Sequence, residues 1–224
     1  MPTLLKVIFI TSLAALTLGG AVATASAGRF SISNQTFRAV WTRMTFGISS
    51  FNMSCPITLE GTFHYRSILK VLRRLIGYVT RAAVGHSCRT SIGTAAEAWA
   101  WNGVERILNE ITTTSVLPLH VTYEGFGGVL PTISRINFLL TGFKLTIAAP
   151  LSGCLATYGG PSSNTLGEAS VSSGTVTELR PEPNTFHAIT ESAAPERCPN
   201  PGTFSGSGTV TQLESGTRIT VTLI

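Results

Sequence analysis

The residue types that carry out most protein chemistry are sparse in this chain, and one of them is missing. All 11 acidic residues are glutamate, because the chain contains no aspartate. This excludes a Ser-His-Asp triad, an aspartic-protease dyad, an EF-hand loop and an Asp-based metal phosphatase. A histidine beside a glutamate or serine could still act as a general acid or base. The four histidines are His64, His86, His120 and His187.

Sequence motifs of common enzymes are missing as well. The chain has no G-x-S-x-G nucleophile elbow, no H-E-x-x-H zinc motif and no phosphate-binding P-loop. We therefore assign no catalytic residue, no metal ligand and no cofactor. The sequence favours a non-enzymatic protein and leaves a secreted hydrolase as an alternative.

The cysteines are even in number, and they are Cys55, Cys88, Cys154 and Cys198. In an exported protein this predicts two disulfides, for which three pairings exist. We expect Cys55–Cys88 and Cys154–Cys198, because each pair closes a local segment. No C-x-x-C motif supports a zinc or redox site, and a metal held by His86 and Cys88 would compete with the disulfide.

A cluster of basic residues is the most visible charged feature. Residues 28–150 carry 12 Lys and Arg against 5 Glu, a net charge of +7, whereas residues 151–224 have a net charge of −3. The cluster centres on Arg66, Lys70, Arg73 and Arg74, which predicts binding to an anionic envelope polymer, a lipid or a protein partner. The alternative is a solvated face whose arginine stems cover apolar surface. Nucleic acid is not expected.

The first 27 residues have the three parts of a secretory signal peptide. Lys6 precedes an apolar stretch from Val7 to Leu18, and Ala25-Ser26-Ala27 forms an A-x-A cleavage site. The alternative is an uncleaved membrane anchor. We expect residues 1–27 to be the signal peptide, residues 28–224 to be one secreted domain, and the protein to be extracellular or in the cell envelope.

The remaining chain has the pattern of a mainly β protein, an antiparallel β-sandwich or barrel-like fold. Alternation of apolar residues places Leu117, Leu119, Val121 and Tyr123 on one face of a strand. Gly142 is expected to break the run 133–148. The expected strands are 37–48, 57–65, 76–83, 95–101, 117–126, 133–148, 169–179, 186–190, 203–213 and 218–224.

Two short segments fit helices better than strands. Residues 66–76 place Arg66, Lys70, Arg73 and Arg74 on one helical face and apolar residues on the other, with Gly77 as a stop. Residues 103–111 are the second candidate. Isolated helices of this length are marginal, so a hairpin over residues 57–83 with a basic tip remains the competing interpretation of the first segment.

Three stretches of the chain together resemble a group of uncharacterised secreted bacterial β-proteins. They are SCPITLEGTFHY (54–65), LPLHVTYEGFGGVLP (117–131) and FSGSGTVTQLESGTRITVTLI (204–224). The resemblance implies export and a β-rich fold, and it implies no activity.

These observations favour a secreted or envelope protein that binds a partner or has a structural role. A membrane-active or pore-forming β-protein is the first alternative, and a secreted hydrolase is the second. Trp41, Trp99 and Trp101 could stack on a sugar, although packing in the core is favoured for them.

Overall fold

The fold is known from a computed structural model of the chain. It describes residues 28–48, 51–84, 89–92, 95–97, 118–129, 132–142, 144–149, 154–159, 164–182, 185–186, 188–191 and 202–224. Every regular element among these residues is a β-strand.

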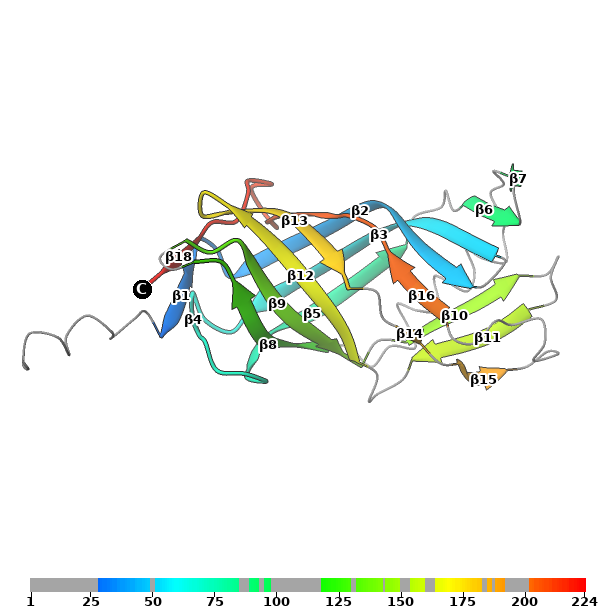
Figure 1. The fold of residues 1–224 in the computed structure, drawn as a ribbon, viewed down its shortest axis with the longest axis horizontal. Coiled ribbons are helices and arrows are strands. Elements are labelled where there is room, and N and C mark those ends of the chain that lie inside the picture. The colour runs from blue at the N-terminus through cyan, green and yellow to red at the C-terminus, as the bar shows by residue number, and fades with distance from the viewer. Residues whose placement is uncertain are drawn as a thin grey trace, which may run out of the picture.

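Eight antiparallel strands curl into a nearly closed barrel (Figure 1). In spatial order from β17 the ladder runs β17-β2-β3-β5-β8-β9-β12-β13. The two edge strands then meet, because Leu179 and Gly208 donate backbone hydrogen bonds of 2.9 and 2.8 Å to each other's carbonyl oxygens. The bounds are β2 Thr36–Ile48, β3 Phe51–Phe63, β5 Leu75–Val84, β8 Leu119–Gly127, β9 Arg135–Thr141, β12 Asn164–Ser172, β13 Thr175–Pro181 and β17 Thr209–Gln212.

Alternation along the strands gives the barrel an apolar interior. In β2 the side chains of Phe37, Ala39 and Trp41 are buried, with exposed fractions of 8%, 1% and 3%. The intervening Arg38 lies on the outer face, where it pairs with Glu60. The period of two in the sequence therefore becomes the inner and outer faces of the wall.

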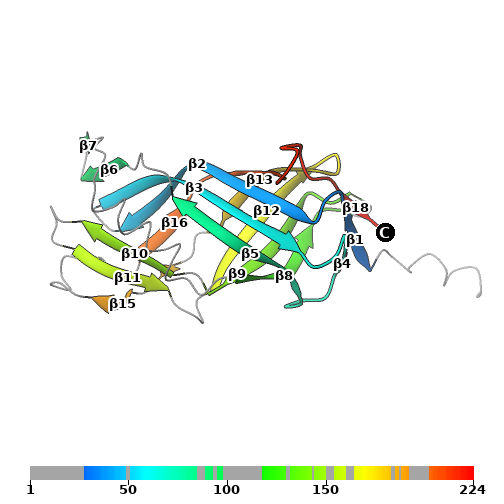
Figure 2. The same cartoon turned by 180° about the vertical axis from the view of Figure 1, so that it is seen from behind.

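A small sheet closes one end of the barrel. Strands β1 (Arg29–Ile32), β4 (Ser67–Leu69) and β18 (Val221–Leu223) pair antiparallel in the order β18-β1-β4. Their buried side chains include Phe30, Ile68 and Val221, which belong to the same apolar cluster as the barrel core. We call this sheet the cap, and it lies at the end that holds the C-terminus (Figures 1 and 2).

The remaining strands lie toward the end opposite the cap (Figure 2). One group forms a second three-stranded sheet in the order β10-β11-β15, and the others extend the barrel sheet from β2 and β3. Their bounds are β6 Arg89–Ile92, β7 Ala95–Glu97, β10 Lys144–Ala149, β11 Cys154–Gly159, β14 Thr185–Phe186, β15 Ala188–Glu191 and β16 Gly202–Ser205.

The expected fold class is confirmed, and the barrel-like form is the one adopted. Residues 118–129 illustrate this, since Leu119, Val121 and Tyr123 are all buried on one face of β8. The run 133–148 breaks beside Gly142, whose φ of 92° suits glycine, and gives β9 and β10.

The helix expected over residues 66–76 is wrong. The segment forms β4, a turn and the start of β5, and β3 pairs antiparallel with β5 from Ile57↔Val84 to Phe63↔Gly77. The competing hairpin with a basic tip matches this arrangement. The segment forms strands and not a helix because Ile68 packs in the cap and Ile76 packs in the barrel. A helix of this length would not make both contacts. The second candidate, residues 103–111, lies outside the described residues.

Three expected single strands are pairs of strands instead. Residues 186–190 divide between β14 and β15, which belong to different sheets. Residues 169–179 turn at Ser173 and Gly174, whose φ angles are 49° and 75°, so that β12 and β13 form a hairpin. Residues 203–213 divide into β16 and β17 at Gly206, with a φ of 136°. Gly174 and Gly206 have the positive φ angles that suit glycine.

Candidate functional site in the barrel interior

The barrel encloses an apolar cavity of 190 Å³. Apart from Thr165 and Arg180, every residue that lines it is apolar, aromatic or glycine. The Arg180 side chain is 58% exposed and its guanidinium pairs with Glu178, so only its stem adds to the wall. The lining includes Phe30, Phe37, Ala39, Trp41, Ile57, Val79, Val121, Leu140, Val176 and Val210.

Aromatic rings lie flat against glycine backbone around this cavity. A Cβ added at Gly208 would be 2.6 Å from Cε2 of Trp41, and one added at Gly61 would be 2.5 Å from Cζ of Phe37. The missing side chains thus make room for these rings beside the wall. The rings supply apolar surface without filling the centre of the barrel.

Two polar atoms in the wall have no hydrogen-bond partner. They are Nε1 of Trp41 and Oγ1 of Thr165, and both atoms are buried. An unpaired buried donor of this kind costs about 1–3 kcal/mol. Neither atom is accessible from the cavity, and a Cβ added at Gly208 would lie 2.8 Å from Nε1 of Trp41, so this atom is close to the Gly208 backbone.

Tyr123 also lines the cavity, and burial raises the pKa of its phenol above the usual value of 10.0. Tyr123 therefore remains uncharged at neutral pH. Because the Arg180 charge lies outside, the cavity presents a neutral surface that suits an apolar molecule.

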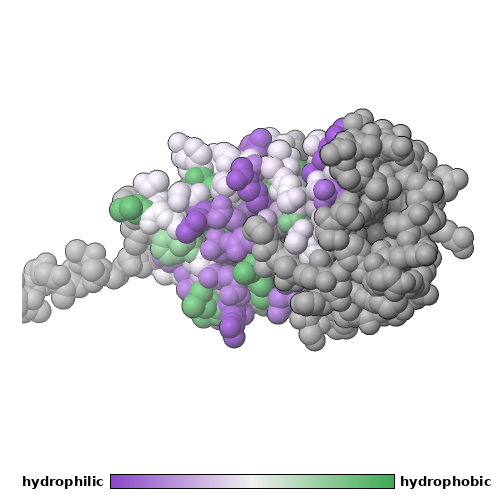
Figure 3. Space-filling model, turned by 45° about the vertical axis from the view of Figure 1, so that its right-hand side comes forward, coloured by the Kyte–Doolittle hydropathy of each residue, from purple (hydrophilic) through white to green (hydrophobic). Residues whose placement is uncertain are grey.

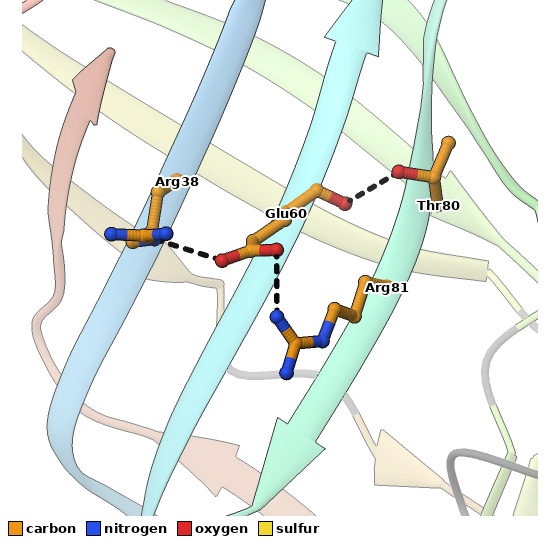
Figure 4. Close-up of polar contacts among 4 residues, drawn as sticks. All are labelled: Arg38, Glu60, Thr80 and Arg81. Carbon is orange, nitrogen blue, oxygen red and sulfur yellow. Dashed lines mark hydrogen bonds and ion pairs between the residues drawn. The ribbon is translucent and has the colours of Figure 1, made fainter. Parts of the chain in front are cut away.

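The carboxylate that forms two ion pairs among the described residues lies on the outer face of the barrel, not in the cavity. Glu60 accepts hydrogen bonds from Nε of Arg38 at 2.8 Å and from Nη1 of Arg81 at 3.2 Å (Figure 4). Burial acts to raise the pKa of Glu60, but the bonds and charges of the two arginines outweigh it and hold the pKa below 4.5. A glutamate kept ionised in this way joins β2, β3 and β5 and is a poor general acid at neutral pH.

The histidines do not assemble an acid-base site among the described residues. His64 and His120 are exposed and flank Tyr78, with ring-centroid distances of 4.7 and 5.3 Å. Neither lines the cavity. His86 and His187 lie outside the described residues. No group of three metal-ligating side chains occurs in the described part of the chain.

The structure places the four expected anion-binding residues near the cap. Arg66 precedes β4, and Lys70, Arg73 and Arg74 lie in the turn between β4 and β5. All except Lys70 are exposed, and Lys70 is half-buried.

Of the cysteines, only Cys55 has a described side chain, and it is fully buried and is not a free thiol. The expected partners of both disulfides lie outside the described side chains, and the two pairings stay predictions.

The sequence does not predict the cavity. The burial of Trp41 confirms the expected core packing, while Trp99 and Trp101 lie outside the described residues. Two features of the sequence point toward the cavity. Apolar residues line the inner face of the barrel strands, and glycines such as Gly61 and Gly208 lie opposite aromatic rings.

Comparison with known proteins adds no further constraint, because no protein-family model, curated protein or solved structure matches the chain. The resemblance to secreted bacterial β-proteins therefore stays an expectation. In the described part of the chain, no helix has the length and apolar character needed to span a membrane.

Proposed function

We propose that the protein is an exported, non-enzymatic binding protein that holds one small apolar molecule inside its barrel. The observation that carries this proposal is the 190 Å³ cavity with its apolar, uncharged wall. Concave, mostly apolar sites with a few polar atoms are typical of ligand-binding proteins, and barrel interiors are one place where they occur.

The cavity volume limits the size of the ligand. A cavity of about 150 Å³ lined by Leu, Ile and Phe stays dry and binds benzene. The slightly larger cavity here suits a hydrocarbon with one or two rings, or a short acyl chain of similar volume.

The polarity of the barrel supports binding over the pore-forming alternative. A membrane-spanning barrel has an apolar outer band and a polar lumen. Here the lumen is apolar, and the outer face carries charged groups such as Arg38, Glu60 and Arg81.

The proposed location rests on the sequence. The signal peptide pattern of residues 1–27 supports export, and the even number of cysteines supports an oxidising compartment.

Fluorescence titration with naphthalene tests the proposed function. In a Trp99→Phe/Trp101→Phe background, Trp41 is the remaining tryptophan and reports on the cavity wall. We expect a saturable change in its emission, and we expect Ala39→Phe to weaken binding at least about tenfold by filling the space.

Val40→Phe is the matched control, because Val40 is next to Ala39 in β2 and does not line the cavity. Ala82→Leu, on β5, is a second cavity-filling variant in case Ala39→Phe does not fold. Unchanged emission in the parent protein, or equal binding by Ala39→Phe and Val40→Phe, would show that the cavity is not the site.

A further inference from the structure

The turn between β4 and β5 presents exposed apolar side chains within a basic segment. We call residues 70–74 the basic loop, and its sequence is Lys-Val-Leu-Arg-Arg. Val71 is 51% exposed and Leu72 is 65% exposed. The backbone N–H of Arg74 donates to the carbonyl of Val71 at 3.1 Å, and Arg73 has a φ of 58°. This tight turn directs the two apolar side chains away from the barrel.

The basic loop is held firmly on the barrel. The N–H of Arg73 donates to the carbonyl of Tyr123 at 2.7 Å, and the N–H of Tyr123 donates to the carbonyl of Arg74 at 2.9 Å. On the other side of the turn, Nζ of Lys70 lies 4.9 Å from the ring centre of Phe126. The two exposed apolar side chains are therefore already held in this position. Their binding to another surface would cost little conformational entropy.

The charges around the loop are uncompensated. None of Arg66, Lys70, Arg73 and Arg74 forms an ion pair among the described residues, whereas Arg38, Arg81, Arg135 and Arg180 each pair with a glutamate. The carboxylate on the neighbouring strand β8 is Glu124, which accepts a hydrogen bond from Thr122. Lys70 precedes the two protruding apolar side chains in the loop, and Arg73 and Arg74 follow them directly. Figure 3 shows hydrophobic and strongly hydrophilic surfaces side by side on the described part of the molecule.

We infer that the basic loop docks the protein on an anionic phospholipid bilayer. Val71 and Leu72 enter the interfacial region, and the four cations contact lipid headgroups, which is the arrangement of peripheral membrane segments. A bilayer is favoured over a soluble anion because two apolar side chains project beside the cations. Each basic residue near an anionic surface raises binding about fivefold. This inference is independent of the cavity ligand.

Vesicle co-sedimentation tests the inference with protein expressed from the full chain. The two probes are phosphatidylcholine vesicles and vesicles of equal parts phosphatidylcholine and phosphatidylglycerol. We expect binding to the anionic vesicles only, with a marked loss at high salt. Leu72→Ser is expected to weaken binding about tenfold by removing the inserted side chain. Arg73→Asn, which tolerates the positive φ, and Arg74→Ser should each weaken binding about fivefold.

Arg43→Ser is the matched control, because Arg43 is exposed on β2 and its loss removes the same charge away from the loop. Its binding should equal that of the parent protein. Equal binding to both vesicle types, or an equal effect of Arg43→Ser and Arg74→Ser, would overturn the inference. Retention on heparin without vesicle binding, unaffected by Leu72→Ser, would also overturn it and assign the loop to an anionic polymer.

Discussion

Glu60 is the residue whose environment is most sharply defined in this protein. Its side chain is only 12% exposed, and two guanidinium groups from neighbouring strands hold its two oxygens. The arginines themselves are 43% and 68% exposed, so solvent screens part of each attraction. The ion pairs of Glu60 therefore stabilise the pairing of β2, β3 and β5 only modestly.

Glu60→Gln should lower the free energy of unfolding at pH 7 by about 1–2 kcal/mol, since it removes the negative charge and one of the two acceptor oxygens that the two arginines share. The folded pKa of Glu60 lies below 4.5, so ionised Glu60 stabilises the fold above about that pH. This contribution is lost as the pH falls through the lower folded pKa. Denaturant unfolding should thus show a gap between parent and variant that narrows in acid.

Glu214→Gln is the control for this comparison, because exposed Glu214 accepts a hydrogen bond from Thr36 and forms no ion pair among the described residues. It should change stability by less than about 0.5 kcal/mol. A Glu60→Gln protein as stable as the parent at neutral pH would mean that the cluster contributes nothing.

At the scale of elements, the pairing of β3 with β6 bears on the disulfides. The register pairs Met53 with Thr90 and Ser54 with Arg89. Cys55 follows Ser54 and Cys88 precedes Arg89 in the sequence, and Cys88 lies outside the described residues. We predict that the pairing would continue by one residue on each strand and bring the two cysteines opposite each other. Directly opposed Cα atoms are about 4.5–5.5 Å apart, within the range that a disulfide spans.

Peptide mapping without reduction should therefore recover a Cys55–Cys88 link, and the link should persist in a Cys154→Ser/Cys198→Ser variant. Its removal should destabilise the fold by about 3–4 kcal/mol on loop-entropy grounds. A peptide that joins Cys55 to Cys154 or Cys198 would refute the extended register.

The sequence predicted elements well where one strand has one buried face. In β8 and β18 alternating apolar residues, such as Val121 and Val221, are buried as expected. The sequence did not predict the correct element where an apolar residue packs against residues from a distant part of the chain. Ile68 and Ile76 have a helical spacing, yet one packs in the cap and the other in the barrel. Local periodicity does not distinguish these two environments.

At the scale of the whole molecule, closure produces the cavity. The barrel closes through the Leu179–Gly208 pair, and the cap covers one end with strands from near both termini. The shape of the space depends on how side chains from every barrel strand meet. The sequence could indicate a β-rich fold with apolar inner faces. It could not predict a cavity, because a cavity depends on the registers between strands that are distant in the chain.

The proposed function requires that the barrel cavity admits an apolar molecule. A crystal structure determined under xenon pressure measures this most directly, because xenon enters dry apolar cavities. We predict xenon density inside the barrel, bounded by Trp41, Val79 and Val121, and none there in the Ala39→Phe variant. A barrel interior that holds no xenon, or that is filled by ordered water, would contradict the proposed function.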